Sequence, residues 1–211
     1  STNELIIIPD SYLLRIPLDI LPISKPDTNY SYGSARYLIE DYHTSYYSSV
    51  REIFENKRSQ FERFDINLSA YGVSNFDHIK NRKLVPLPFA EKEIKEIGSH
   101  LTSLTKLNLF SGDEASKSHF LNSATQSKVI HLATHSEVSN EDPLYSTLYF
   151  KNGTEQDTVS EDGTLYAYEL YNLDLKSELI FMNSCSSGSG NYMQGTGIMG
   201  INRALRYAGA K

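Results

Sequence analysis

Residues 179–190, which read LIFMNSCSSGSG, constrain the fold of this chain more than any other stretch. The apolar run from Leu179 to Met182 ends at a small polar turn that carries Cys185, the one cysteine of the protein. A strand that is apolar on consecutive positions is covered on both faces, as in a parallel sheet between layers of helices. We therefore expect Cys185 just past the C-terminal end of such a strand, where the functional groups of open α/β sheets gather.

A second apolar run ends in the same way. Residues 128–136 read KVIHLATHS, and a strand over this run makes His135 its last residue before a polar loop, on the same face as His131. Neighbouring parallel strands lie about 5 Å apart, so a His and a Cys at adjacent strand ends are able to meet. We therefore predict that Cys185 is a nucleophile and that His135 is its base.

Length and composition describe an ordinary soluble domain. The chain has 211 residues, of which 39% are hydrophobic and 22% charged, enough for one sizeable α/β domain. No apolar run approaches the roughly 20 residues of a membrane span, and the N-terminus does not read as a signal peptide. A single cysteine excludes an intramolecular disulfide framework. We therefore expect a cytoplasmic protein that does not enter a membrane.

Charge and spacing argue against other classes of partner. Twenty basic and 26 acidic residues give a net charge of -6, which disfavours direct contact with nucleic acid. His131 and His135 would lie together on a helix, but on a strand they are too far apart to chelate a metal, so we expect His131 to be a packed or hydrogen-bonded core residue. The pattern G-x-G-x-x-G at 195–200 follows its strand by about ten residues, too late for a dinucleotide site. We predict no cofactor and no metal.

The periodicity of the chain predicts alternating strands and helices. Strands are expected at 4–9, 36–47, 64–73, 107–110, 128–136, 146–150 and from 178 onward, and helices at 50–57, 91–101, 113–124, 165–173 and 197–207. This order is typical of a three-layer α/β/α sandwich with a mostly parallel sheet. The last residues, 208–211, read as the approach to a further strand, so we expect that the domain lacks its C-terminal strand or belongs to a longer chain.

The ordered set of motifs resembles the CHAT domain, a caspase-like module of the cysteine-peptidase clan that includes caspases and separase. The resemblance rests on LIIIPDSYLLRIPLDILP, ARYLIEDYHTSYYSS, PLPFAEKEIKEI, LFSGDEASKSHF, VIHLATHSEVSNEDPLYSTLYF, ELYNLDLKSELIFMNSCSSGSG and GTGIMGINRALRYAGA, in the family's order. It implies one domain over residues 1–211 with a caspase/hemoglobinase-like fold. It also implies a regulatory partner, since helical repeats often accompany this family.

The same resemblance implies a catalytic role for two residues. His135 and Cys185 match the family's catalytic dyad, and their separation of 50 residues is close to the His-to-Cys spacing of caspases. The activity implied is that of an endopeptidase working through a thioester. The backbone N–H groups of Ser136 and Cys185 would form the oxyanion hole. The family usually has Gly after the His, and Ser136 serves there only if the backbone does not require a positive φ.

The substrate is a protein or peptide on this reading, and its side-chain preference has a weaker basis. Glu137, Glu141 and Asp142 follow His135, and an acidic lip there would favour a basic residue at P1; the alternative is a solvated loop. Asp142, Glu137 and Ser184 are the candidate substrate-binding residues. A different class of function also stays open, namely a catalytically silent CHAT-like module that binds a peptide or acts as a scaffold.

Overall fold

We analysed a computed structural model of the chain. The structure describes residues 3–9, 13, 16–25, 32–47, 50–55, 66–101, 105–139, 141–153, 162–184 and 197–210. The chain divides into two compact units, Ser1–Arg58 and Ser59–Lys211. Each unit is described by itself below, and the single domain expected over 1–211 stays a prediction.

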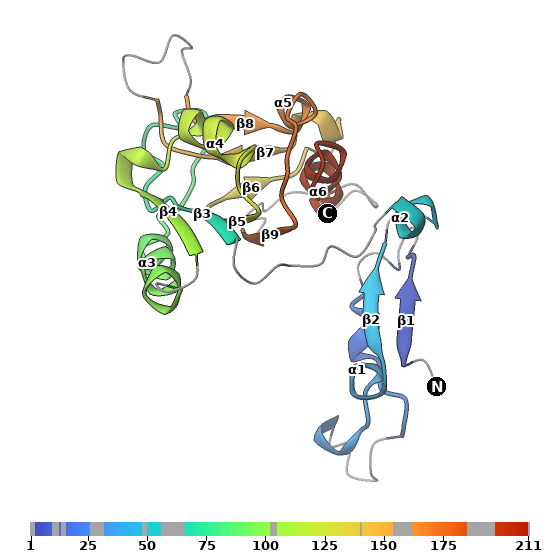
Figure 1. The fold of residues 1–211 in the computed structure, drawn as a ribbon. Helices are drawn as coiled ribbons and strands as arrows, with labels where there is room; N and C mark the ends of the chain where they lie inside the picture. Colours follow the sequence, from blue (N-terminus) through green and yellow to red (C-terminus); the bar gives the residue numbers. More distant parts are fainter. Residues whose placement is uncertain are drawn as a thin grey trace. The chain divides into compact units, whose positions relative to one another are not determined.

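The first unit contains a small parallel sheet. Strands β1 (Glu4–Ile7) and β2 (His43–Tyr46) pair in parallel, as Figure 1 shows in blue. The described part of the unit also contains the 3-10 helices η2 (Leu18–Ile20) and η3 (Tyr32–Ser34) and the helices α1 (Leu38–Asp41) and α2 (Val50–Glu55). The strand expected over 36–47 is therefore wrong in its first half, where α1 forms. The side chain of Glu40 accepts a hydrogen bond from the Tyr37 backbone N–H at 3.1 Å and stabilises this helical turn.

The second unit is built on a four-stranded sheet. Its strands are β3 (Ile66–Gly72), β4 (Thr105–Ser111), β5 (Val129–Ala133) and β9 (Leu179–Asn183), in the spatial order β4-β3-β5-β9. All three neighbouring pairs are parallel. The predicted class, mixed α/β with a mostly parallel central sheet, is confirmed.

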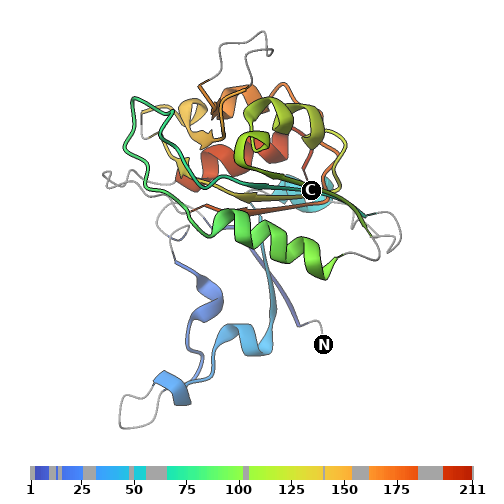
Figure 2. The same ribbon diagram turned by 90° about the vertical axis from the view of Figure 1, so that its left-hand side faces the viewer.

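Helices cover this sheet on both faces. Helix α3 (Ala90–His100) lies on one face, and α4 (Lys117–Ala124) and α6 (Gly197–Tyr207) lie on the other, as seen edge-on in Figure 2. The α3 side is a small cluster of Leu68, Ala70, Ala90, Ile94, Val129 and Ala133. The larger cluster, on the opposite face, includes Ile130 and Leu132. Alternate residues of β5 thus enter opposite cores, as the period of a strand requires.

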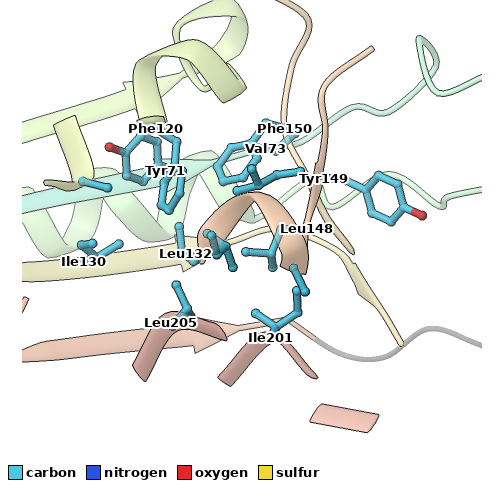
Figure 3. Packing of buried hydrophobic residues seen from close by; sticks show 14 of the residues in the cluster. Tyr71, Val73, Phe120, Ile130, Leu132, Leu148, Tyr149, Phe150, Ile201 and Leu205 are labelled. Atoms are coloured by element: carbon cyan, nitrogen blue, oxygen red, sulfur yellow. The ribbon is translucent and has the colours of Figure 1, made fainter. Parts of the chain in front are cut away.

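The larger cluster is aromatic at its centre. Tyr71 is fully buried and its ring lies near three phenylalanine rings, with centroid distances of 4.8 Å to Phe110, 5.5 Å to Phe120 and 6.0 Å to Phe150. Figure 3 shows Tyr71 beside Phe120, with Ile201 and Leu205 of α6 on the other side of Leu132. This packing holds α4 and α6 against the sheet that carries His135 and Ser184 at its C-terminal edge.

Three short strands form a second, antiparallel sheet. They are β6 (Ser136–Glu137), β7 (Thr147–Tyr149) and β8 (Thr164–Tyr166), in the order β6-β7-β8. The 3-10 helix η5 (Pro143–Tyr145) connects β6 to β7, and α5 (Ala167–Leu170) follows β8. The helix expected over 165–173 is therefore wrong at its start, because residues 164–166 pair with β7.

Two further expectations need correction. The helix expected over 113–124 is divided into a 3-10 turn, η4 (Gly112–Glu114), and α4, because the Ser116 side chain accepts from the His119 N–H and caps the helix at Lys117. Strand β9 is covered on one face only within the described residues: Ile180 and Met182 pack on the larger core, whereas Phe181 is 53% exposed. Among the described helices, none has the length and apolar character needed to cross a membrane.

Candidate active site

His135 lies at the C-terminal edge of the parallel sheet, two residues beyond the end of β5. The residue is 2% exposed, and its ring centroid is 4.7 Å from that of Phe76. The His135 Nε2–H donates a hydrogen bond to the Val85 carbonyl oxygen at 2.7 Å. This bond selects the tautomer in which Nδ1 is the acceptor nitrogen, so Nδ1 is the atom suited to take up a proton.

Cys185 lies outside the described residues, which end on this side of the sheet at Ser184. The strand that leads to it is described in full. Strand β9 pairs with β5 in parallel, from Val129 opposite Leu179 to Ala133 opposite Asn183. The condition under which His135 and Cys185 could meet, that their strands are parallel neighbours, is therefore fulfilled by the two strands. The paired residues differ by 50 in residue number throughout.

Ser136 follows His135 and begins β6. It therefore has an extended backbone, and the sequence departs from the family's glycine at a position where no positive φ is needed. The Ser136 residue is buried, and its hydroxyl donates to the Ser184 hydroxyl at 3.0 Å. Two of the candidate residues proposed from sequence, Ser136 and Ser184, are thus in direct contact.

A small pocket opens beside this contact. Its volume is about 140 Å³, and it is lined by Ser136, Glu137, Val138, Met182, Ser184, Ile201 and Asn202. The walls come from three elements of the second unit, since Met182 belongs to β9, Glu137 to β6 and Ile201 to α6. A pocket of this size accommodates a single side chain of moderate size, and its walls are mainly apolar.

Glu137 belongs to the pocket wall but its carboxylate is already partnered. Its Oε2 accepts hydrogen bonds from Arg82 Nε at 2.8 Å and from the Tyr149 hydroxyl at 2.7 Å. The bond to Glu137 raises the pKa of Arg82, and burial raises the pKa of Tyr149 to about 12. The negative charge of Glu137 is therefore balanced by Arg82, a residue of the loop before α3 that the sequence analysis did not single out.

The other acidic candidates lie on the loop after β6. The Asp142 side chain accepts from the Leu144 N–H at 2.9 Å and caps η5, and the Asp142 N–H donates to the Ser139 hydroxyl at 3.2 Å. Asp142 is half-buried and Glu141 is exposed. Neither Asp142 nor Glu141 lines the pocket beside Ser136. The influence of Asp142 on the preference for the P1 residue of a substrate stays a prediction.

Three polar residues missed or set aside by the sequence analysis meet on the α3 face. Glu93 Oε1 lies 2.7 Å from His131 Nε2, and the Asn183 side-chain amide lies 3.0 and 2.9 Å from the two carboxylate oxygens of Glu93. The prediction that His131 is a hydrogen-bonded core residue is confirmed. The sequence did carry a signal for Glu93, because it is a charged residue on the stripe of α3 that includes Ala90, Ile94 and Ile97.

The glycine pattern at 195–200 has a packing explanation at its last position. A Cβ on Gly200 of α6 would lie 2.6 Å from the Ser146 hydroxyl and 3.0 Å from the Pro143 carbonyl oxygen. Glycine is therefore required for α6 to approach η5 closely, without any phosphate. Gly195 lies outside the described residues, as do residues 187–190 of the small polar turn.

Comparison with known proteins identifies the family. No protein of curated function matches the chain. The family model described as CHAT domain matches residues 1–211, the whole chain. CHAT domains are caspase-like and related to peptidases, in agreement with the parallel sheet of the second unit and with the position of His135 at its C-terminal edge. The chain belongs to the CHAT domain family.

Proposed function

We propose that the chain is a cysteine endopeptidase in which His135 activates Cys185. The observation that carries this proposal is the register of β5 and β9, in which every residue of β5 faces the residue 50 positions later. His135 and Cys185 are also 50 positions apart, each two residues beyond its strand. Adjacent parallel strands are separated by about 5 Å, so equivalent positions at their ends are within reach of a proton transfer.

The proposed reaction is an acyl transfer to sulfur. His135 takes the proton of the Cys185 thiol, the thiolate attacks the scissile carbonyl carbon, and the C–N bond breaks as the leaving amine takes that proton from His135. Water then attacks the thioester, His135 accepts a proton from it, and the carboxylic acid and the free thiol are regenerated. An unperturbed thiol with a pKa near 8.5 is only a few per cent ionised at neutral pH, so the reaction requires a base beside the sulfur.

The negative charge of the tetrahedral intermediate needs backbone donors. We assign this role to the N–H groups of Ser136 and Cys185. The extended conformation of Ser136 supports the assignment, because a serine amide donates as well as a glycine amide where φ is negative. Removal of one such donor from a hole of this kind costs about 10²-fold or more in rate.

The substrate proposed is a protein or peptide, with the activity governed by helical repeats or another regulatory partner. The pocket beside Ser136 and Ser184 is the candidate place for a substrate side chain, with Glu137 in its wall. Because Arg82 balances the charge of Glu137, a preference for a basic residue at P1 would come from the other acidic residues of this stretch, Glu141 and Asp142, and we propose Asp142. No residue of this proposal requires a cofactor.

Labelling of the thiol tests the proposal directly. The wild-type chain, Cys185→Ala, His135→Ala and His100→Ala are treated at neutral pH with a peptide-based thiol-reactive probe, alone and with the rest of the natural polypeptide or complex. His100 is an exposed histidine at the end of α3, so its replacement controls for the loss of an imidazole. We expect labelling of wild type and His100→Ala, and little or none of the other two.

The pattern of results separates three conclusions. Labelling that needs both Cys185 and His135 supports the dyad. If it occurs only in the larger assembly, the domain is held inactive until a partner orders its loops. Equal, slow labelling of wild type and His135→Ala in both settings would mean that His135 does not activate Cys185, and the silent binding module would replace the peptidase.

A further inference from the structure

The last residue of β9 is fixed to helix α3. The side-chain amide of Asn183 lies 3.0 and 2.9 Å from the two oxygens of the Glu93 carboxylate, although the two residues are 90 positions apart in the chain. Glu93 is in the first turn of α3, and a carboxylate near a helix N-terminus is favoured by the helix dipole. An amide that donates to a carboxylate makes a charge-assisted bond, which is stronger than a neutral one.

The carboxylate of Glu93 also contacts a residue of the neighbouring strand, His131 of β5. His131 Nε2 lies 2.7 Å from Glu93 Oε1, and the side chains of His131 and Glu93 are 12% and 31% exposed. Glu93 therefore joins the middle of β5 to the end of β9. This arrangement limits the positions that Asn183 can take relative to β5, the strand that leads to His135.

The next residue is fixed on the opposite face of the sheet. Successive side chains of a strand point to opposite faces, and the Ser184 hydroxyl accepts from the Ser136 hydroxyl at 3.0 Å. The two residues immediately before Cys185 are thus hydrogen-bonded on opposite faces of the sheet, Asn183 to Glu93 and Ser184 to Ser136. Within the described residues β9 has a hydrogen-bonded neighbour strand on one edge only, so these two side-chain contacts add to the main-chain bonds with β5 in fixing its end.

We infer that Glu93 and Asn183 are positioning residues for Cys185: their bond sets the direction in which the chain leaves β9 and thereby the distance between the Cys185 thiol and His135. This inference rests on the proposed function. A displacement of about 1 Å at a reacting atom costs about 10²-fold in rate, so loss of the bond should slow the reaction of the thiol without removing the binding of a peptide.

An exchange of the two functional groups provides a sharp test. Asn183→Asp preserves side-chain size but removes the donor and places two carboxylates together. Glu93→Gln also preserves size, but it removes the charge and leaves one carbonyl oxygen as acceptor, so it weakens the contact without abolishing it. The double variant puts the amide on α3 and the carboxylate on β9, and the carbonyl oxygen of the amide on α3 stays available to His131. Glu96→Gln is the matched control, because Glu96 lies on the same helix and its side chain is 62% exposed.

Two quantities are measured for each variant with the peptide-based probe: the maximal labelling rate at saturating probe and the probe concentration that gives half of it. Thermal unfolding is measured in parallel. For Asn183→Asp we expect the maximal rate to fall by about tenfold or more, and for Glu93→Gln by a smaller factor, with a half-saturating concentration close to that of wild type in both. The double variant should recover most of the lost rate, and Glu96→Gln should behave like wild type.

Either failure is recognisable. Labelling that depends on His135 but is unchanged in both single variants would overturn this inference and leave the proposed function intact. The inference would also be overturned if the double variant did not recover the labelling rate that the single variants lose. The same holds if the labelling rate falls in proportion to the melting temperature across all the variants. Labelling that does not depend on His135 would overturn the proposed function, and this inference with it.

Discussion

The hydroxyl of Ser136 donates to the hydroxyl of Ser184 at 3.0 Å, although the two serines are 48 residues apart in the chain. One serine follows His135 and the other precedes Cys185. The bond therefore joins the two segments that carry the proposed dyad. It also explains why small hydroxyl residues stand at these two places, since larger side chains would separate the ends of β5 and β9.

We expect Ser136→Ala and Ser184→Ala to destabilise the protein by similar amounts. A net hydrogen bond between neutral groups contributes about 1 kcal/mol to the free energy of unfolding, and each substitution removes the same bond. The double variant should therefore lower the free energy of unfolding by about as much as either single variant does. Chemical denaturation of all four proteins gives the coupling free energy, and strictly additive effects would show that the bond contributes nothing.

Gly72→Ala should destabilise the second unit by about 1–3 kcal/mol, because a Cβ there overpacks the contact between β3 and α3. It would lie 2.7 Å from the Ala90 carbonyl oxygen and 3.1 Å from the Glu91 Cα, both of which are backbone atoms that cannot move alone. The midpoint of chemical denaturation measures the effect.

Gly98→Ala is the matched control for this glycine substitution. Its Cβ would lie 2.7 Å from the Leu109 Cδ1, the end of a flexible side chain, and alanine gains about 1 kcal/mol in helix propensity over glycine. We therefore expect a small net change in the free energy of unfolding. Equal losses at Gly72 and Gly98 would contradict the distinction between rigid and flexible neighbours.

Alkaline pH should weaken the fold through its buried tyrosines. Burial raises the pKa of Tyr71 and that of Tyr149 to about 12, whereas an unfolded tyrosine ionises near 10. The neutral form is the one that the folded state favours, so this contribution to stability is complete below pH 10 and is lost as the pH rises through 12, by about 1.4 kcal/mol for each pH unit and each tyrosine.

Unfolding midpoints between pH 8 and pH 12 measure this loss. Tyr149→Phe should make the stability fall less steeply over that range, and Tyr207→Phe, at a position that is 74% exposed, controls for the loss of a hydroxyl. An unchanged slope in Tyr149→Phe would mean that Tyr149 ionises no later in the folded chain than in the unfolded one.

Asp142 allows charge and capping to be separated. Asp142→Asn removes the charge but keeps an oxygen for the Leu144 N–H, whereas Asp142→Ala removes both. If Asp142 influences the P1 preference, both variants should lose activity toward peptides with a basic P1 residue and keep it toward neutral ones. If Asp142 matters only as the cap of η5, Asp142→Ala should lose activity and Asp142→Asn should not. The loss should then be the same for peptides with a basic and with a neutral P1 residue. Unchanged cleavage of both peptides by Asp142→Ala would show that Asp142 does not influence the P1 preference.

The central sheet could be predicted from sequence because its strands consist of consecutive apolar residues, although β9 buries only alternate ones. The runs around Ile130 and Ile180 are strongly apolar and end at polar turns, and both form parallel strands. The long helices α3 and α6 were equally clear from their periodicity. A parallel sheet followed from this pattern, and with it the expectation that His135 lies at the functional edge of the sheet. The pairing of β5 with β9 was a condition of that expectation, and the structure fulfils it.

Several short elements were missed, and the start of α5 was placed too early, for identifiable reasons. Strands of two or three residues, such as β6 and β8, have no periodicity of their own and form by pairing with β7. Helices α1 and α5 begin after Tyr37 and Tyr166, which are unusual N-cap residues. In both cases a glutamate three residues later, Glu40 or Glu169, accepts from the tyrosine N–H. The pattern Y-x-x-E is thus half of a capping box, and a search for the usual serine or aspartate overlooks it.

The partners of the acidic residues could not be derived from sequence. Glu137 was read as part of an acidic lip, but Arg82, 55 residues earlier, balances its charge. Glu93 received no attention because its partners lie on two strands, at His131 and Asn183. Such pairings depend on how loops and helices cross the ends of the strands, and no local pattern encodes that.

The position of β9 at the edge of the described sheet has a consequence for local opening. Strand β3 lies between β4 and β5, whereas β9, in the part of the chain that the structure describes, exchanges main-chain hydrogen bonds with β5 alone. Its amide protons should therefore exchange with solvent sooner than those of β3, in openings that leave the rest of the sheet folded. A partner that adds a strand beside β9 would suppress those openings, and the protection of its amides from deuterium would report when the proposed catalytic segment is held in place.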